Sequence, residues 1–89
     1  MPTIAVTLTP ALTRLFPGCP HQLELEAASV SELLAALDAR WPGMRDRLAD
    51  SLPRVRPHVN IFVDGERSSL ETRLKSGATV LIVTAISGG

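Results

Sequence analysis

The sequence predicts an α+β fold in which a mixed sheet of four to five strands carries one main helix packed on one face. Alternating apolar and polar residues mark a strand near the start of the chain, an apolar strand lies near its end, and a capped amphipathic helix lies between them. The pair Asp64-Gly65, which favours a tight turn, joins two strands in the second half. Since 89 residues suffice for one hydrophobic core but not for two, we expect one domain over residues 1–84.

The first two strands are expected at Thr3–Leu8 and Gln22–Glu26. In both segments apolar and polar residues alternate, which is the period of a half-buried strand. Three prolines and a glycine between residues 9 and 20 interrupt any ladder or helix. We therefore expect a hairpin with a long loop.

The main helix is expected to begin after Ser29, because Ser29 and Glu32 have the spacing of a capping box. In this motif the serine oxygen accepts the amide of the third helical residue, and the glutamate reaches back to the serine amide. One helix face is apolar and consists of Val30, Leu33, Leu34 and Leu37. The helix should end near Arg40, since a proline and a glycine follow.

A shorter helix is expected within 43–52, and its inward residues should be Met44, Leu48 and Leu52. Val59–Val63 predicts a strand that turns back through Glu66 and Arg67. A short turn of helix is expected within 68–74. Val80–Thr84 is apolar on both faces, which places this last strand inside the sheet. If it pairs parallel to the first strand, the right-handed crossover packs the helix on one face, which is the β-grasp arrangement.

Composition excludes several classes of function. Nine basic and nine acidic residues give a formal net charge of zero, which favours neither a nucleic-acid binder nor a membrane binder. The N-terminus lacks the basic region of a secretory signal, and no apolar run approaches ~18 residues, so we expect a soluble, cytoplasmic protein. The glycines form no nucleotide-binding loop, and no hydrolase motif is present, so no catalytic centre and no bound cofactor are expected.

Cysteine and histidine offer no metal site. Cys19 is the single cysteine, and His21 and His58 lie far apart in the sequence. We assign these three residues no chemistry and expect no bound metal.

The C-terminal segment is the most informative part of the sequence. The last strand runs into Ala85–Gly89, and we expect this segment to be a flexible tail that ends in Gly88 and Gly89. A terminal carboxylate with a pKa of about 3.5 is a poor electrophile at neutral pH. A mixed anhydride with AMP would activate its carbonyl carbon, and a sulfur donor could then leave a thiocarboxylate. That chemistry needs an unhindered acyl carbon on a slim tether, which two glycines supply.

Four segments resemble the MoaD/ThiS family of ubiquitin-like sulfur carriers, and they are Val59–Glu66, Leu74–Gly77, Val80–Val83 and Ala85–Gly89. The resemblance implies a carrier that is not itself an enzyme. Gly89 would be adenylated by an E1-like enzyme, which uses the ATP, and converted to a thiocarboxylate, with Gly88 as its slim neighbour. The implied partners are this E1-like enzyme, a sulfur donor and a sulfur-accepting synthase, with no nucleic acid and no membrane.

The resemblance leaves the receiving pathway open among cysteine, molybdopterin and thiamine synthesis. Trp41–Leu48 and Arg56–Asn60 look most like the carriers of cysteine synthesis. Thr84-Ala85 stands where molybdopterin carriers often have a proline. Two alternatives are the small subunit of a two-subunit sulfurtransferase such as molybdopterin synthase, and a ubiquitin-like modifier or an adaptor with an inert tail.

A docking surface is expected on one face of the sheet. Strand alternation separates Phe62, Leu81 and Val83 from Ile61, Val63, Val80 and Ile82. If the helix covers the second group, the first group faces outward and, together with Ile86, forms a docking site, unless a second layer or a dimer covers it. A further set forms either a solvated rim or a docking patch, and it consists of Arg40, Arg45, Arg47, Arg54 and Arg56.

Overall fold

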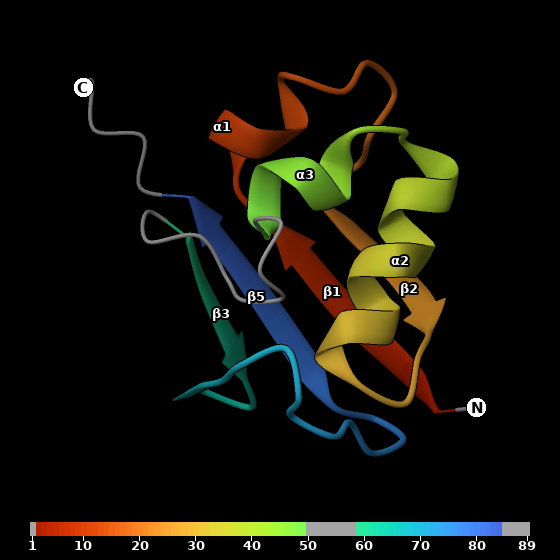
Figure 1. Ribbon diagram of the computed structural model, residues 1–89, viewed down its shortest axis with the longest axis vertical. Coiled ribbons are helices and arrows are strands. Elements are labelled where there is room, and N and C mark those ends of the chain that lie inside the picture. The colour runs from red at the N-terminus through yellow and green to blue at the C-terminus, as the bar shows by residue number, and fades with distance from the viewer. Residues whose placement is uncertain (1, 50–58, 85–89) are drawn as a thin grey trace.

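The computed structural model describes residues 2–49 and 59–84. These residues form one five-stranded mixed sheet with the strand order β2-β1-β5-β3-β4. The strands are β1 (Thr3–Leu8), β2 (Gln22–Glu26), β3 (Val59–Val63), β4 (Glu66–Arg67) and β5 (Thr79–Thr84), and the helices are α1 (Pro10–Thr13), α2 (Val30–Arg40) and α3 (Met44–Leu48). Helices α2 and α3 lie on the same side of the sheet (Figure 1).

The sheet has the predicted β-grasp topology. β1 pairs antiparallel with β2 and parallel with β5, so the first and last strands lie side by side at its centre. β3 pairs antiparallel with both β5 and β4. The last strand begins at Thr79, one residue earlier than predicted, because Thr79 continues the ladder opposite Ala5. The two-sided apolar character of the last strand thus correctly indicated a central position.

The core lies between the sheet and α2 with α3. Its strand residues alternate with exposed ones, as the sequence predicts, and they include Ile4, Val6, Leu8, Ile61, Val80 and Ile82. The predicted inner face of α2 is confirmed, since Val30, Leu33, Leu34 and Leu37 are all fully buried. Met44 and Leu48 of α3 also point inward as expected, while Leu52 lies outside the described residues.

The N-terminus of α2 is capped almost as predicted. The amide of Glu32 donates to Ser29 Oγ at 3.2 Å. The Glu32 carboxylate accepts from the amide of Ala28 at 3.2 Å, not from the amide of Ser29 as expected. The Glu32 side chain thus extends one residue further toward the N-terminus than expected, and the cap still satisfies two amides at this helix end.

The segment 68–74 contains a turn and not the expected turn of helix. The amide of Val30 donates to the carbonyl of Thr72 at 3.0 Å, and the amide of Ser31 donates to the carbonyl of Leu70 at 2.9 Å. Ser29 and Arg73 form an antiparallel bridge. Because these carbonyl groups pair with the first turn of α2, they are not available for a local helix.

The loop after β1 contains a helix that the sequence analysis did not predict. Pro10 occupies the first turn of α1, where proline removes no hydrogen bond because the first amides of a helix have no partner within it. The expectation that Pro10 interrupts any helix is therefore wrong. Among the described residues, no helix combines the length and the apolar character that crossing a membrane would need.

Candidate functional site

The end of β5 is anchored at the centre of the sheet. The hydroxyl oxygens of Thr9 and Thr84 lie 3.4 Å apart, and the amide of Thr9 donates to the carbonyl of Ile82 at 3.3 Å. Helix α1 follows Thr9 directly and contacts β5 (Figure 1). The end of β5 is therefore held by Thr9, the residue between β1 and α1. The predicted site residues Ile86, Gly88 and Gly89 lie outside the described residues.

The two faces of the sheet differ as the alternation predicts. Ile82 is fully buried, whereas its neighbour Leu81 is 39% exposed. Leu81 lies opposite the half-buried Phe62 in the β5–β3 ladder, and Val83 lies on the same face. The structure thus brings together three of the four predicted docking residues. Whether they bind a partner remains a prediction.

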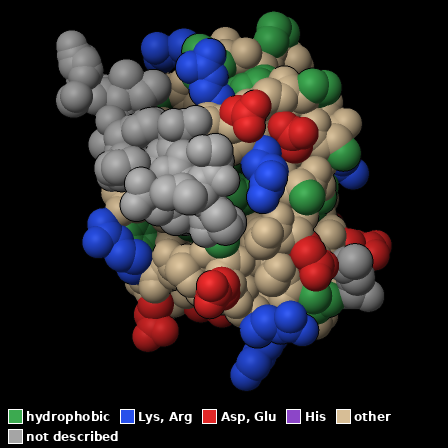
Figure 2. All heavy atoms as spheres, in the orientation of Figure 1, with side chains coloured by type: hydrophobic (Ala, Val, Ile, Leu, Met, Phe, Trp, Pro, Cys, Tyr) green, Lys and Arg blue, Asp and Glu red, His purple; other side chains and the backbone are tan. Residues whose placement is uncertain are grey.

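We call the face turned away from α2 the open face. Its residues are Gln22, Glu24 and Glu26 of β2, Thr3, Ala5 and Thr7 of β1, Thr79, Leu81 and Val83 of β5, Asn60 and Phe62 of β3, and Arg67 of β4. On the helix side, hydrophobic side chains outside the grey region are scattered among charges of both signs (Figure 2). On the open face, in contrast, the apolar side chains gather on the two strands β3 and β5.

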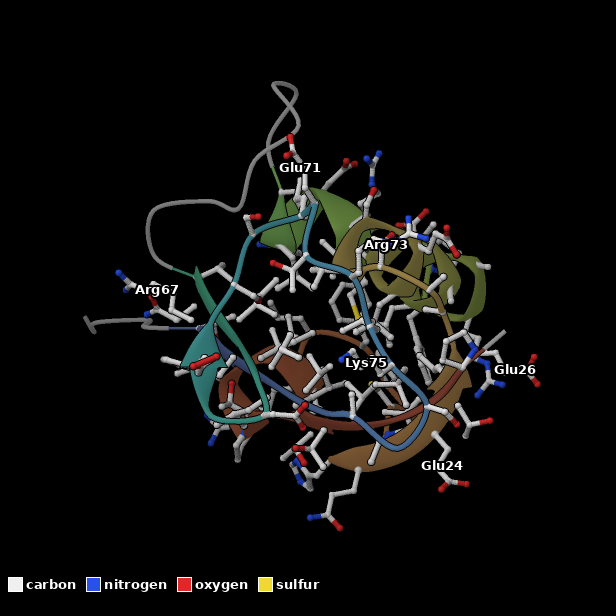
Figure 3. The ribbon with its side chains drawn as sticks, turned by 90° about the horizontal axis from the view of Figure 1, so that it is seen from below. Glu24, Glu26, Arg67, Glu71, Arg73 and Lys75 are labelled. Carbon is white, nitrogen blue, oxygen red and sulfur yellow. The ribbon has the colours of Figure 1, made fainter. Side chains whose placement is uncertain are left out.

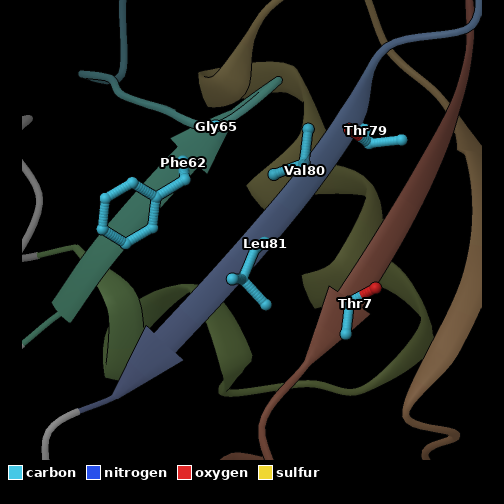
Figure 4. A pocket seen from close by; sticks show the side chains of 6 residues that line it. All are labelled: Thr7, Phe62, Gly65, Thr79, Val80 and Leu81. Atoms are coloured by element: carbon cyan, nitrogen blue, oxygen red, sulfur yellow. The ribbon is translucent and has the colours of Figure 1, made fainter.

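A hollow of about 510 Å³ lies at the centre of the open face, and its lining residues are Thr7, Phe62, Gly65, Thr79, Val80 and Leu81. In Figure 4 the helices lie behind the sheet, and the side chains of Phe62 and Leu81 flank this hollow. Its lining therefore comes from three strands and the β3–β4 turn, which the sequence alone does not bring together.

One end of the hollow is fixed by the turn at Asp64-Gly65. The Asp64 amide donates to the Thr79 carbonyl at 2.8 Å, and Asp64 Oδ1 accepts from the amide and the hydroxyl of Thr79 at 2.9 and 3.1 Å. Asp64 and Gly65 both have positive φ, at 52° and 87°, which is the backbone expected for this pair. The turn and β5 are thus held together by three hydrogen bonds.

Charged residues lie at the two edges of the open face. Glu24 and Glu26 extend from β2, while Arg67 extends from β4 at the opposite edge (Figure 3). A guanidinium nitrogen of Arg67 donates to Asn60 Oδ1 on β3. Across the open face β2 therefore carries two glutamates, β5 and β3 carry the apolar residues, and β4 carries Arg67, an arrangement that was not predicted because it depends on the strand order.

The remaining residues singled out in the sequence form no site with the open face. Cys19 is partly buried, and this burial raises the pKa of its thiol, which disfavours the nucleophilic thiolate. His21 Nδ1 lies 3.3 Å from the hydroxyl of Thr13, and His58 lies outside the described residues. In the ranges 2–49 and 59–84, no three His, Cys, Asp or Glu residues come close enough to hold a metal ion.

The arginine set is only partly described. Arg40, Arg45 and Arg47 are exposed on α2 and α3, on the side of the sheet opposite Leu81. Arg54 and Arg56 lie outside the described residues. The described arginines of this set therefore do not border the open face.

Solved structures share this fold over nearly the whole chain. CysO in the BexX/CysO complex of Amycolatopsis orientalis is 27% identical, with 97% of this chain and 99% of that chain covered and a TM-score of 0.82. CysO of Mycobacterium tuberculosis is 25% identical, with 93% and 99% covered and a TM-score of 0.81. SAMP1 from Haloferax volcanii, at 20% identity, 98% and 99% coverage and a TM-score of 0.81, shows the fold alone.

A sequence relative is the tRNA-cytidine(32) 2-sulfurtransferase of Sorangium cellulosum (strain So ce56), which is 40% identical over 62 residues. The match includes 67% of this chain but only 22% of the relative, so this chain spans about a fifth of that protein. The model of the ThiS family matches residues 11–89, which include most of the sheet and both terminal glycines. The chain therefore belongs to the ThiS family of ubiquitin-like sulfur-carrier proteins.

Proposed function

We propose that this chain carries sulfur as a thiocarboxylate at the carboxyl group of Gly89. The observation that supports this most strongly is the ThiS family match, which extends through residue 89 and so includes Gly88 and Gly89. Glycine at both positions leaves the acyl carbon unhindered. The chain would thus be a protein substrate, and its partner enzymes would supply the catalytic groups.

Two steps load the carrier. A carboxylate oxygen of Gly89 attacks the α-phosphorus of ATP bound to an E1-like enzyme, which forms an acyl adenylate and releases pyrophosphate. A donor at the oxidation level of sulfide then attacks the acyl carbon. A carbon–sulfur bond forms, the bond to AMP breaks, and AMP leaves with its electron pair. No oxidant or reductant is consumed.

The open face is the proposed docking surface for the adenylating enzyme. Phe62, Leu81 and Val83 lie on β3 and β5, and β5 leads directly toward residues 85–89. An enzyme bound to Leu81 is therefore close to the start of the tail at Thr84, which the Thr9 contact holds. Ile86 is proposed to extend this surface. The interaction would take place in the cytoplasm, where ATP is available.

The test measures the mass of the intact chain after incubation with the E1-like enzyme of the same organism, Mg-ATP and sulfide. We expect the mass gain that replacement of one oxygen by one sulfur produces. Deletion of Gly89, or addition of one residue after it, should abolish the gain, because the reacting carboxyl group is then displaced. Conversion of either variant to a thiocarboxylate would refute the proposal.

The similarity to the Sorangium protein favours a second candidate for the enzyme that receives sulfur from the loaded carrier. That relative is a tRNA-cytidine(32) 2-sulfurtransferase, and a region similar to this chain makes up part of its length. We propose that the loaded carrier delivers sulfur to an enzyme of this class, as an alternative to cysteine, molybdopterin or thiamine synthesis. The chain itself would contact the enzyme and not the RNA.

Transfer can be followed with ³⁵S. The carrier is loaded with radioactive sulfide, purified, and incubated with tRNA, the tRNA 2-sulfurtransferase of the same organism and Mg-ATP, which activates the cytidine oxygen that leaves. Label in the tRNA supports this receiving reaction. Label that stays on the carrier excludes it without affecting the loading reaction, because loading has already been measured by mass.

A further inference from the structure

The outer edge of β2 is unpaired along the part of the chain that the structure describes. β2 stands first in the strand order, so its only partner there is β1 (Figure 1). An outer strand exposes a row of backbone N–H and C=O groups to which a further strand can pair. This edge lies two strands away from β5, so it is separate from Phe62 and Leu81.

The hydrogen bonds between β1 and β2 show which backbone groups face outward. The amide of Leu8 donates to the carbonyl of His21 at 2.7 Å, and the amide of Ala27 donates to the carbonyl of Pro2 at 3.0 Å. In an antiparallel ladder, residues bonded to the neighbouring strand alternate with residues whose backbone groups point away from it. The odd-numbered residues of β2 are therefore bonded to β1. The residues that present N–H and C=O groups to the free edge are Gln22, Glu24 and Glu26.

Two of these three residues carry a carboxylate for which β1 offers no partner. Glu24 and Glu26 are exposed and lie opposite the uncharged residues Ala5 and Thr3. Within residues 2–49 and 59–84, neither glutamate has an ion-pair partner. The position on the other side of each glutamate is the free edge. A basic residue on an added strand would be the direct neighbour of the carboxylate, and such cross-strand pairs of opposite charge are stabilising.

A second copy of this chain does not match this edge. In an antiparallel pairing centred on Glu24, the two Glu24 carboxylates would lie directly opposite each other, which is destabilising. A register shifted toward Glu26 would produce two pairs of Glu24 with Glu26. A register shifted toward Gln22 would bring Pro20, which has no amide to donate, opposite Glu26. The edge therefore favours a strand of different sequence.

We propose that this edge binds an extended segment of a partner protein that has lysine or arginine at every second position. The segment adds a sixth strand, antiparallel to β2, and its backbone pairs with Gln22, Glu24 and Glu26. Its basic side chains lie beside the two carboxylates on the open face. The residues between them are apolar and lie on the helix side, where they cover the half-buried Leu23. Strand addition needs neither the tail nor a thiocarboxylate, so it goes beyond the proposed function and does not depend on it.

A synthetic peptide tests strand addition by the full chain. The probe is a blocked peptide in which lysine and valine alternate, and the control peptide has the same residues arranged as one block of each. In millimolar probe, hydrogen exchange of the Glu24 and Glu26 amides should slow by at least about tenfold, because both amides gain an acceptor. The amides of Leu23 and Leu25, which are already bonded to β1, are internal references. Absence of this protection, or equal protection by the control peptide, would overturn the proposal.

Glu24→Pro tests the backbone contribution. Proline removes an amide that points away from β1, so the circular dichroism spectrum should be unchanged. Glu24→Thr is the matched control, because it removes the same charge and keeps the amide. Affinity for the probe should be at least about fivefold lower for Glu24→Pro than for Glu24→Thr, since one hydrogen bond is lost. Equal affinities of two folded variants would contradict pairing at this edge.

A charge reversal tests the side chains and remains decisive if Glu24→Pro does not fold. Glu24→Lys combined with Glu26→Lys should reverse the preference, so that a peptide of alternating glutamate and valine binds more tightly than the probe. Glu71→Lys, away from β2, should leave the preference unchanged (Figure 3). An unchanged preference of the double variant would overturn the charge assignment. A dimer of the original chain that Glu24→Thr strengthens in sedimentation velocity would assign the edge to a second copy and would also overturn the proposal.

Discussion

The two faces of strand β5 are similarly apolar in sequence, but they differ in how far their side chains are buried. Val80 and Ile82 are 1% and 0% exposed beneath the helices, whereas Leu81 between them is 39% exposed. Full burial of a leucine side chain is worth about 1.5–3 kcal/mol, so the open face leaves part of this free energy unused in the folded chain. The difference teaches that a strand apolar on both faces can serve stability with one face and recognition with the other.

The covered face should show the largest effect on stability. Ile82→Ala removes a fully buried side chain from the centre of the sheet, so we expect the free energy of unfolding to fall by about 2–5 kcal/mol. Urea denaturation followed by circular dichroism measures it. A loss below about 1 kcal/mol would mean that the two faces do not differ as described.

The open face should show the reverse pattern. Leu81→Asp places a carboxylate where water already reaches, so the free energy of unfolding should fall by only about 1–2 kcal/mol, less than for Ile82→Ala. Affinity for the adenylating enzyme should fall by at least about tenfold, because a desolvated charge would face an apolar group. Calorimetric titration gives the affinity, and gross unfolding of this variant would show that Leu81 supports the core.

A comparison of two glycine variants separates the effect of backbone strain on stability from the effect of the hollow on docking. Gly65 and Gly18 have φ values of 87° and 84°, and an added Cβ would meet nothing within 4 Å at either position. Each change to alanine should therefore cost about 1–2 kcal/mol of stability through the backbone alone. Because only Gly65 lines the hollow, Gly65→Ala should also weaken docking, with Gly18→Ala as the matched control. Equal affinities of the two variants would speak against the hollow as a binding feature.

The smallest effect is expected at Cys19, which is not part of the open face. Cys19→Ser should leave thiocarboxylate formation unchanged. Burial raises the pKa of the thiol, so less thiolate is present at a given pH, and alkylation by iodoacetamide should begin at higher pH than for free cysteine. A block of sulfur loading by Cys19→Ser would show that sulfur passes through this thiol.

Local patterns predicted the elements well where the local chemistry alone determines them. The bounds of β1 and β2 follow from alternation, those of β3 from its composition and the Asp64-Gly65 turn, and those of α2 from the helical stripe and the cap at Ser29. The segment 68–74 was assigned wrongly because its carbonyl groups pair with α2, about 40 residues away along the chain. Helix α1 was not predicted, because the sequence alone does not distinguish a proline in the first turn of a helix from a proline that ends a helix.

The candidate site was predictable only in part, for a similar reason. Alternation placed Phe62, Leu81 and Val83 on one face, and the apolar last strand placed them near the centre. The hollow depends on Thr7 and Leu81 becoming neighbours through a parallel pairing between the two ends of the chain. Glu24 and Arg67 lie at opposite edges of the face only because β2 and β4 are the outer strands, and the sequence alone does not show this order.

The parallel pairing of β1 with β5 also has a consequence for biosynthesis. The ribosome makes β1 first, yet the strand that completes its ladder and fills the centre of the sheet is made last of all five. Until residues 79–84 emerge, β1 and β3 have no central strand to join them, and the core residues Val80 and Ile82 are missing. Pairing across such a sequence separation is slow compared with helix formation. The newly made chain therefore presents its finished open face only after synthesis has passed β5, so an enzyme that selects this face selects folded carriers.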